Sequence, residues 1–292
     1  MLIDDLDKII REIFNYEEFE DPCKEGLQKL NMRFGIPFEK YYTPDFLKYY
    51  NGLMMRNSNK IERIFCMTFL DAALIYKVLY TYGSNTMIFS HHPLGYKNDN
   101  IGFRPVREEI LEHMRISENS IFTLHHPLDI SNTISTRYEL AKVVNLDIMG
   151  EFYNFCGGYT GVYGRTKYKF FNEFLEEVKA KIKAPYIDVV KYHPRCNKIA
   201  LVPGGGNDPV AMKEAVSLGC DTYLTGVISL NAEDKELQKQ VKEFLELARV
   251  NNVNLIGVGH HNSEKFAIMK MAYFFNQNGL STKFISNRNG DY

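Results

Sequence analysis

Six of the eight histidines in this 292-residue chain fall in three adjacent pairs. Two pairs occur in similar stretches, TMIFSHHPLGY (residues 86–96) and SIFTLHHPLDI (residues 120–130), and the third is in VGHHNSE (residues 258–264). A single histidine is most often a surface residue or a satisfied core residue, but His91 and His92 both follow an apolar, strand-like run. A bend at the end of a strand lets neighbouring side chains point into one pocket. Two imidazoles placed in this way can each hold a different metal ion.

Carboxylates accompany the second and third pairs at a spacing of four residues. His125 precedes Asp129, and His260 precedes Glu264. If a helix starts at residue 260, positions i and i+4 share a face, so that His260 and Glu264 form a workable ligand pair. Divalent ions accept carboxylate as well as imidazole. Together the three segments offer enough ligands for two metals a few ångströms apart, as two-metal hydrolytic sites use.

Apolar periodicity predicts elements that bring these residues to one edge of a sheet. Strands are expected at residues 61–69, 86–90 and 120–124, and helices at 71–83, 105–117 and 135–144. Strands that alternate with helices form largely parallel sheets. The two His-His-Pro-Leu stretches therefore follow the carboxyl ends of successive strands, the edge at which open α/β sheets bind ligands.

A second alternating half begins near residue 186. It follows a Gly- and Tyr-rich strand or turn region at 157–165 and a helix at 167–182. The expected strands are 186–192, 197–204, 221–226 and 253–259, and the expected helices are 208–219, 232–250 and 262–275. The third pair again ends a strand and opens a helix. The predicted fold is two similar α/β lobes with mixed, largely parallel sheets that face a shared metal-binding cleft.

The amino-terminal part of the chain differs from the rest, because residues 1–60 have mainly helical periodicity. We assign it a packing or capping role. The predicted division is a helical extension at 1–60, a first α/β half at 61–150, a connecting region at 151–185 and a second half at 186–292.

The composition of the chain disfavours nucleic-acid-binding, membrane-spanning and secreted classes of protein. Hydrophobic residues make up 45% of the chain and charged residues 24%, as in ordinary globular proteins. The net charge of -1 disfavours nucleic acid as a partner, and no run approaches the roughly 20 apolar residues of a membrane span. The acidic amino terminus is unlike a signal peptide, and the five cysteines show no CxxC spacing, so we expect a cytoplasmic protein with reduced thiols.

The segments SHHPL, HHPLD and GHHNSE resemble the Nif-three-like family, also known as GTP cyclohydrolase I type 2 homologues. Their order and spacing agree over roughly residues 60–285, and LVPGGGND and DTYLTG look like the family's glycine loop and Thr-Gly strand end. The resemblance implies that His91 and Asp129 bind one metal ion, that His92 and His260 bind the other, and that Glu264 bridges both.

The resemblance has further implications. His125 matches a family histidine beside the site, and with Glu264 it is a candidate catalytic residue. His126 stands where the family commonly has Thr, and His261 contacts substrate, water or neither. The expected cofactors are two divalent ions per chain, drawn from Zn, Fe, Mn, Co and Ni. The chain matches the compact family form without the inserted middle domain, whose members form ring-shaped hexamers, and the amino-terminal helices can then lie at a subunit contact.

Two divalent ions held by imidazoles and carboxylates can lower the pKa of a bound water and polarise the bond that it attacks. We therefore predict a hydrolase that uses a metal-activated water on a small-molecule substrate, a nucleotide or related heterocycle, with a site carboxylate or His125 moving the proton. By resemblance, opening of the guanine ring of GTP is one such reaction. The alternative is a metal-binding oligomeric scaffold or regulatory interaction protein without turnover.

The glycine loop allows two interpretations. Gly204 to Asp208 can cradle a phosphate on backbone N–H groups. The same residues can instead form a tight turn in which Asp208 caps a helix that begins at Pro209.

Overall fold

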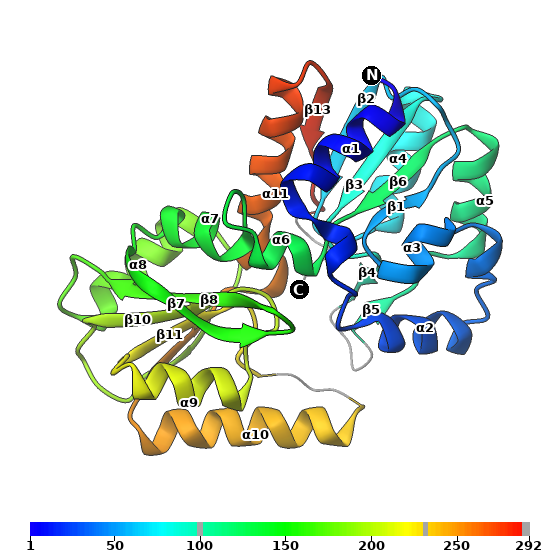
Figure 1. Ribbon diagram of the computed structural model, residues 1–292. Helices are drawn as coiled ribbons and strands as arrows, with labels where there is room; N and C mark the ends of the chain where they lie inside the picture. Colours follow the sequence, from blue (N-terminus) through cyan, green and yellow to red (C-terminus); the bar gives the residue numbers. More distant parts are fainter. Residues whose placement is uncertain (98–101, 230–232, 288–292) are drawn as a thin grey trace. The chain divides into compact units, whose positions relative to one another are not determined.

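The computed structural model describes residues 1–97, 102–229 and 233–287. These residues form two compact units, each with a sheet of its own (Figure 1). Among the described residues, the first unit contains Met1–Lys97, Gly102–Ile134 and residues 268–287, and the second contains Ser135–Ala267.

The sheet of the first unit has five strands in the order β1-β6-β3-β2-β13. β1 runs antiparallel to β6, and the other neighbouring strands are parallel. The sequence predicted β2, β3 and β6, but not β1 and β13. The bounds are β1 (Gly52–Met55), β2 (Arg63–Met67), β3 (Thr86–Ser90), β6 (Ser120–Thr123) and β13 (Ser281–Phe284).

Helices surround this sheet, and the start and end of α4 were marked in the sequence. Asp71 accepts a hydrogen bond from the N–H of Leu74 at 2.9 Å, and the helix ends at Gly83, whose φ is 70°. A small hairpin, β4 and β5, follows the first histidine pair. The elements are α1 (Ile3–Phe14), η1 (Tyr16–Glu18), α2 (Lys24–Arg33), η2 (Phe38–Lys40), α3 (Pro44–Tyr49), α4 (Ala72–Tyr82), β4 (Gly95–Tyr96), β5 (Phe103–Arg104), α5 (Glu108–Ile116) and α6 (His126–Ile130).

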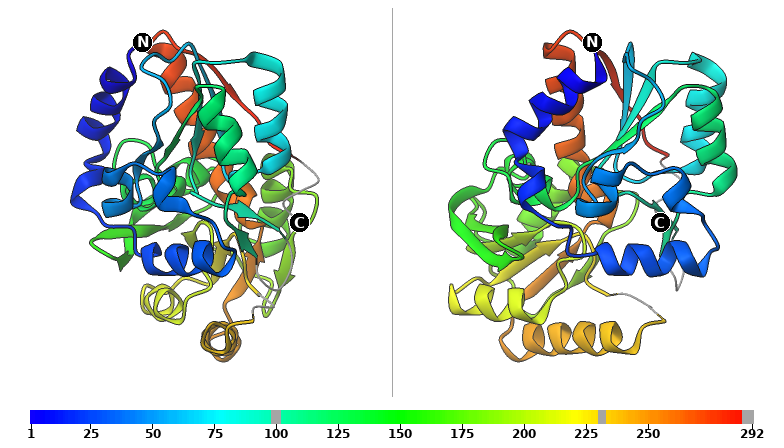
Figure 2. Two further views of the ribbon diagram at one scale, coloured as in Figure 1. Left: turned by 90° about the vertical axis from the view of Figure 1, so that its right-hand side faces the viewer. Right: turned by 45° about the vertical axis from the view of Figure 1, so that its right-hand side comes forward.

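Strand alternation separates the two faces of this sheet. Phe89 contacts the ring of Phe275 in α11 at a centroid distance of 5.1 Å, and Phe122 contacts that of Tyr16 at 5.8 Å. Ile88, next to Phe89 in β3, belongs instead to a core cluster that includes residues of α4 and α5. Figure 2 shows α4 and α5 on one side of this sheet and α1 on the other. The sheet is therefore buried on both faces, which explains its nearly continuous apolar strands.

The second unit has a six-stranded sheet in the order β7-β8-β10-β11-β12-β9. The three strands β10, β11 and β12 are parallel, whereas β7, β8 and β9 add antiparallel pairings. Cys156 and Gly157 join β7 to β8 and both have positive φ, as a tight hairpin turn requires. The bounds are β7 (Asp147–Phe155), β8 (Gly158–Arg165), β9 (Asp188–Val190), β10 (Lys198–Val202), β11 (Thr222–Thr225) and β12 (Asn254–Gly257).

Two helices cover each face of this second sheet (Figure 1). Residues of α7 and α8 pack with Leu201 and Leu224 on one face, and residues of α9 and α10 pack with Ala200 and Tyr223 on the other. The bounds are α7 (Thr136–Val143), α8 (Phe171–Ile182), α9 (Pro209–Ser217), α10 (Lys235–Val250) and α11 (His260–Gln277).

The predicted mixed α/β fold is confirmed, with two sheets of mixed strand direction. Three predictions include residues outside the described ranges. The predicted first half contains residues 98–101, and the second half contains residues 230–232 and 288–292. The helix expected from residue 232 is observed from Lys235. In the described parts of the chain, no helix combines the length and the apolar character needed to cross a bilayer.

Candidate metal centre

The first two histidine pairs lie at the carboxyl ends of neighbouring parallel strands, as predicted. His91 and His92 directly follow β3, and His125 follows β6 after one residue. The ring centroids are separated by 4.4 Å for His91 and His92, 4.6 Å for His92 and His125, and 5.0 Å for His91 and His125. One nitrogen of each ring lies within 4.8 Å of the other two. These three residues, called the histidine cluster below, could hold a metal ion.

His91 has the geometry of a metal ligand. The residue is fully buried, and its Nδ1 lies 2.9 Å from the carbonyl oxygen of Leu124. A carbonyl oxygen can only accept, so Nδ1 carries the proton and Nε2 of the neutral ring keeps its lone pair. That Nε2 lies 3.5 Å from Oδ1 of Asp129. A lone pair and a carboxylate oxygen thus lie close together, as the predicted pairing of His91 with Asp129 requires.

His92 is held by an aromatic neighbour and by its backbone. Its ring stacks on Phe69 at a centroid distance of 4.4 Å and an interplanar angle of 8°. Its N–H donates to the carbonyl of Thr68 at 2.9 Å, and the hydroxyl of Ser90 donates to its carbonyl at 2.8 Å. Only 4% of the residue is exposed. The imidazole is therefore fixed in orientation before any ligand binds.

Asp129 reaches the histidine cluster because α6 begins directly after His125. The carbonyl of His125 accepts hydrogen bonds from the N–H groups of Leu128 and Asp129, at 2.9 Å and 3.3 Å. Pro127 lies in the first turn, where its missing N–H costs no hydrogen bond. The His-Pro-Leu-Asp spacing therefore forms one helical turn that brings the carboxylate back beside His91.

His125 is bound by two residues that no sequence pattern singled out. Its Nδ1 lies 2.7 Å from Oδ2 of Asp21, which is only 1% exposed, and its N–H donates to Oδ1 of Asn51 at 2.9 Å. Burial by itself raises the pKa of Asp21, but the attraction of His125 and its hydrogen bond outweigh burial and leave that pKa below 3.8. Asp21 is therefore ionised at neutral pH.

The third histidine pair lies in the second unit, at the start of α11. Nε2 of His260 lies 3.1 Å from Oε1 of Glu264, and both side chains are largely buried. This confirms the prediction that residues 260 and 264 share one face of a helix. The hydroxyl of Ser263 accepts from the N–H of Gly204 at 2.8 Å and donates to the carbonyl of His260 at 2.7 Å, so it joins the glycine loop to the helix start.

Gly204 is close to this pair. Its φ is 65°, and a Cβ at this position would lie 2.4 Å from Oε1 of Glu264 and 3.2 Å from Nε2 of His260. Only a glycine leaves room for both side chains. Further along the loop, Asp208 accepts a hydrogen bond from the N–H of Val210 and Pro209 is the first residue of α9, which confirms the tight-turn interpretation.

The second members of the last two pairs are buried. His126 is 2% exposed and its ring lies edge-on to that of Phe19. Burial, with a contribution from the positive charge of Lys265, lowers the pKa of His261 to about 4. His261 is therefore uncharged at neutral pH.

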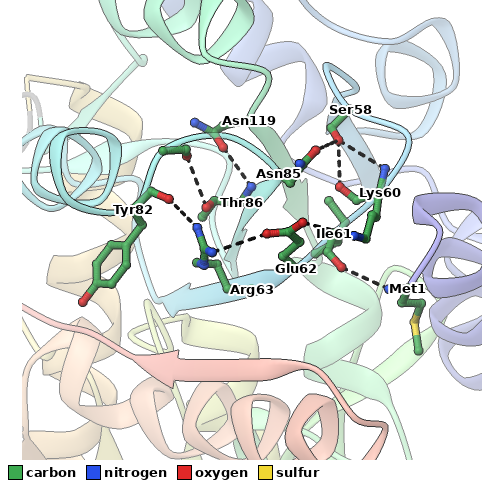
Figure 3. Close-up of polar contacts among 11 residues, drawn as sticks. Met1, Ser58, Lys60, Ile61, Glu62, Arg63, Tyr82, Asn85, Thr86 and Asn119 are labelled. Atoms are coloured by element: carbon green, nitrogen blue, oxygen red, sulfur yellow. Dashed lines mark hydrogen bonds and ion pairs between the residues drawn. The ribbon is translucent and has the colours of Figure 1, made fainter.

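The opposite edge of the first sheet is also polar. A cavity of about 430 Å³ is lined by residues 56–60, Asn85 and Glu118. Figure 3 shows part of this region, in which Ser58 donates to Asn85 at 2.7 Å and Thr86 N–H donates to Asn119 at 2.8 Å. The two cations of its lining, Arg56 and Lys60, pair with the carboxylates of Asp4 and Glu62. We therefore place the chemistry at the histidine edge, where α/β sheets bind ligands.

Comparison with known proteins agrees with the motifs at this edge. The model of the Duf34/NIF3 (NGG1p interacting factor 3) family matches residues 38–290. The chain belongs to this family. The chain is also similar to proteins named GTP cyclohydrolase 1 type 2 homolog. The one from Buchnera aphidicola (subsp. Acyrthosiphon pisum) is 25% identical over 223 residues, 76% of this chain and 82% of that protein. The one from Borreliella burgdorferi is 27% identical over 266 residues, 88% and 94% of the two chains.

Solved structures show the same fold. A structure described as protein ybgI, of unknown function, has a TM-score of 0.73 at 19% identity, over 99% of this chain and 100% of that chain. Reduced HcgD from Methanocaldococcus jannaschii has a TM-score of 0.63 at 22% identity, over 89% and 97% of the two chains. The chain therefore shares its mixed α/β fold with these structures.

Proposed function

We propose that this protein is a hydrolase that binds two divalent metal ions per chain and acts on a nucleotide or a related heterocycle. The observation that carries the proposal is the placement of His91 and His92 side by side after β3, with the carboxylate of Asp129 beside His91. The proposed ligands are His91 and Asp129 for one ion, His92 and His260 for the other, and Glu264 as the bridge.

The residues of each unit fit such ions. In the first unit, the hydrogen bond from Nδ1 of His91 to a carbonyl leaves Nε2 as the donor atom, and metal-ligating histidines commonly have such a partner. In the second unit, the missing side chain of Gly204 leaves room at His260 and Glu264. Imidazole and carboxylate together suit Zn, Fe, Mn, Co or Ni.

Divalent ions bound here would lower the pKa of a bound water and polarise the substrate bond that this water attacks. The residues of the chain supply proton transfer and orientation. Nε2 of His125 accepts the proton that the attacking water loses, and it returns this proton to the leaving nitrogen of the heterocycle, so that one water is consumed and no net proton is released from the protein. Phe69, stacked on His92, keeps that ring in place and excludes water from one of its faces.

Unpaired buried polar atoms support ligand binding in both units. Among the described residues, the hydroxyls of Thr68 and Thr123 in the first unit have no hydrogen-bond partner, nor do the hydroxyl of Thr225 and the amide nitrogen of Asn207 in the second. Each follows or ends a strand at the carboxyl edge or lies in the glycine loop. A buried group without a partner costs about 1–3 kcal/mol, and such groups commonly pair with a ligand or water. In a protein whose metal ions serve only the structure, nothing would offset the free-energy cost of four such unpaired polar groups.

The proposal includes a cytoplasmic homo-oligomer, with a ring-shaped hexamer as the expected form. None of the five cysteines forms a disulfide in the described structure, as is usual in a reducing compartment. The strand β7 lies at the edge of its sheet, and its Ile148 and Met149 are 36% and 47% exposed. Apolar edge strands favour association between chains. The same feature favours the second candidate, an oligomeric metal-binding scaffold without turnover.

Elemental analysis of the purified protein tests the metal site first. We expect about two transition-metal ions per chain in the wild type and fewer in His92→Ala and Glu264→Ala. His113→Ala is the matched control, because this histidine contacts only Tyr76 and Tyr80 among the described aromatic rings. A wild-type protein that stays metal-free after reconstitution would rule out the mechanism.

A hydrolysis assay distinguishes the hydrolase from the metal-binding scaffold. Nucleotides and cyclic amides are incubated with the loaded protein, and hydrolysis is followed by mass spectrometry. Turnover that disappears in Glu264→Ala while the oligomer persists supports the hydrolase. Metal-dependent assembly with no turnover on the whole panel supports the scaffold.

A further inference from the structure

We infer that Asp21 is a positioning residue that fixes the tautomer of His125, so that the amino-terminal segment completes the site. Asp21 lies before residue 38, where the match to the family model begins. The use of His125 as a proton carrier rests on the proposed function, whereas the control of its tautomer by Asp21 does not.

The contact is short, buried and directional. Oδ2 of Asp21 lies 2.7 Å from Nδ1 of His125, across 104 residues of sequence. The carboxylate is 1% exposed. A carboxylate oxygen accepts hydrogen bonds, so Nδ1 of His125 is the donor. In the neutral ring Nε2 then carries the lone pair.

The backbone around both residues holds them in register. The N–H of Cys23 donates to Oδ1 of Asp21 at 2.8 Å, which leaves Oδ2 for His125. The N–H of Asp21 itself donates to the carbonyl of Tyr49 at 2.9 Å. The amide oxygen of Asn51 accepts from the N–H of His125 at 2.9 Å. The carboxylate of Asp21 and the backbone of His125 are thus each anchored independently of their mutual contact.

The fixed tautomer has a direct consequence for His125. Its ring lies 4.6 Å from that of His92 and 5.0 Å from that of His91, between centroids. With Nδ1 occupied by Asp21, the remaining nitrogen, Nε2, is the atom that can accept a proton. When it does so, the imidazolium is stabilised by the ionised Asp21, as in catalytic histidine–carboxylate pairs.

The variant Asp21→Asn tests this without relying on activity. The N–H of Cys23 needs an acceptor, so Oδ1 of the new amide stays with it and the NH₂ group faces Nδ1 of His125. Nδ1 must then accept, and the proton moves to Nε2. Long-range ¹H–¹⁵N NMR of the metal-free protein at pH 8 distinguishes the two tautomers directly. Glu20→Gln is the matched control, since this neighbouring side chain is 63% exposed and pairs only with Lys24 among the described ion pairs.

We expect the Nδ1–H form of His125 in the wild type and in Glu20→Gln, and the Nε2–H form in Asp21→Asn. An Nε2–H form in the wild type overturns the inference even if the Asp21 variant fails to fold. An unchanged tautomer in a folded Asp21→Asn overturns it as well. So does a cobalt spectrum of the wild type that shows thiolate ligation by Cys23, because Asp21, Cys23 and His125 would then form a metal site of their own.

A second readout separates this inference from the proposed function. If the protein is a hydrolase, Asp21→Asn should bind the same metal per chain as the wild type and lose about 100-fold or more in kcat, because the general base has the wrong tautomer. If the wild type shows the predicted tautomer but hydrolyses nothing, Asp21 still positions His125 and only the proposed function fails.

Discussion

Gly204 gives the most quantitative prediction about the second unit. Replacement by alanine puts a Cβ 2.4 Å from Oε1 of Glu264, and the backbone has a φ of 65°. The substitution therefore lowers the free energy of unfolding in two separate ways. An alanine in the left-handed region is strained, and the carboxylate must leave its place beside His260.

The two costs can be estimated separately. The left-handed conformation costs an L-residue roughly 1–2 kcal/mol, and the loss of glycine's freedom in the unfolded chain returns about 0.4–1 kcal/mol. Overpacking of a filled site adds about 1–3 kcal/mol. Because Glu264 is nearly fully buried, its carboxylate has little space into which to move. We therefore expect the free energy of unfolding to fall by about 2–4 kcal/mol in Gly204→Ala.

Two other glycines of the same unit provide matched controls. Gly219 has a φ of 71°, but a Cβ added there would meet no atom within 4 Å, so Gly219→Ala measures the backbone cost alone, about 1 kcal/mol. Gly205 has neither a positive φ nor a neighbour within 4 Å, so Gly205→Ala should change stability by less than about 0.5 kcal/mol. Urea titration of the metal-free proteins gives the three values, and elemental analysis shows whether Gly204→Ala alone loses metal.

The order of the three variants in unfolding free energy tests whether the glycine loop shapes the His260–Glu264 pair. If Gly204→Ala is no less stable than Gly219→Ala and keeps its full metal content, then the alanine side chain does not displace Glu264. The role of the glycine loop in shaping the His260–Glu264 pair would then be refuted, whatever the effect on backbone strain.

Three further predictions concern polar groups and thiols. Thr225→Val should stabilise the metal-free protein by about 1 kcal/mol, because the Thr225 hydroxyl has no hydrogen-bond partner among the described residues. Thr222→Val in the same strand should destabilise the protein, because the Thr222 hydroxyl donates to Asp221. Urea titration of both variants measures the two changes in unfolding free energy, and changes of the same sign would contradict the reasoning. Burial raises the pKa of Cys196 and Cys220 from 9.0 to about 12, so their stabilisation of the fold is complete below pH 9, and the urea midpoint should fall as the pH rises from 9 toward 12. Under native conditions a thiol reagent should modify two cysteines per chain rapidly, and three fast-reacting thiols would contradict the observed burial. The exposed thiols are Cys23 and Cys156, and the buried ones are Cys66, Cys196 and Cys220.

Local sequence patterns determined the positions of several helices and strands and one side-chain contact. The helix α4 is marked by Asp71 at its start and Gly83 at its end, and both signals act over a few residues. The apolar runs before the histidine pairs predicted β3 and β6 within one residue. The spacing of His260 and Glu264 predicted their contact, because a helix fixes the geometry of residues four apart.

Other features depended on contacts between distant segments, and no local pattern predicts those. The strand β13 lies beside β2, more than 200 residues earlier in the chain, and its four residues show no period of their own. Asp21 occurs in a short polar stretch that resembles a surface loop, yet it is buried against His125. Sequence alone determined which residues are candidates for the chemistry, since residue type and local spacing can be read directly from the chain. Only the tertiary structure decided which partner fixes each imidazole, because burial and hydrogen bonding are set by the segments that fold against it.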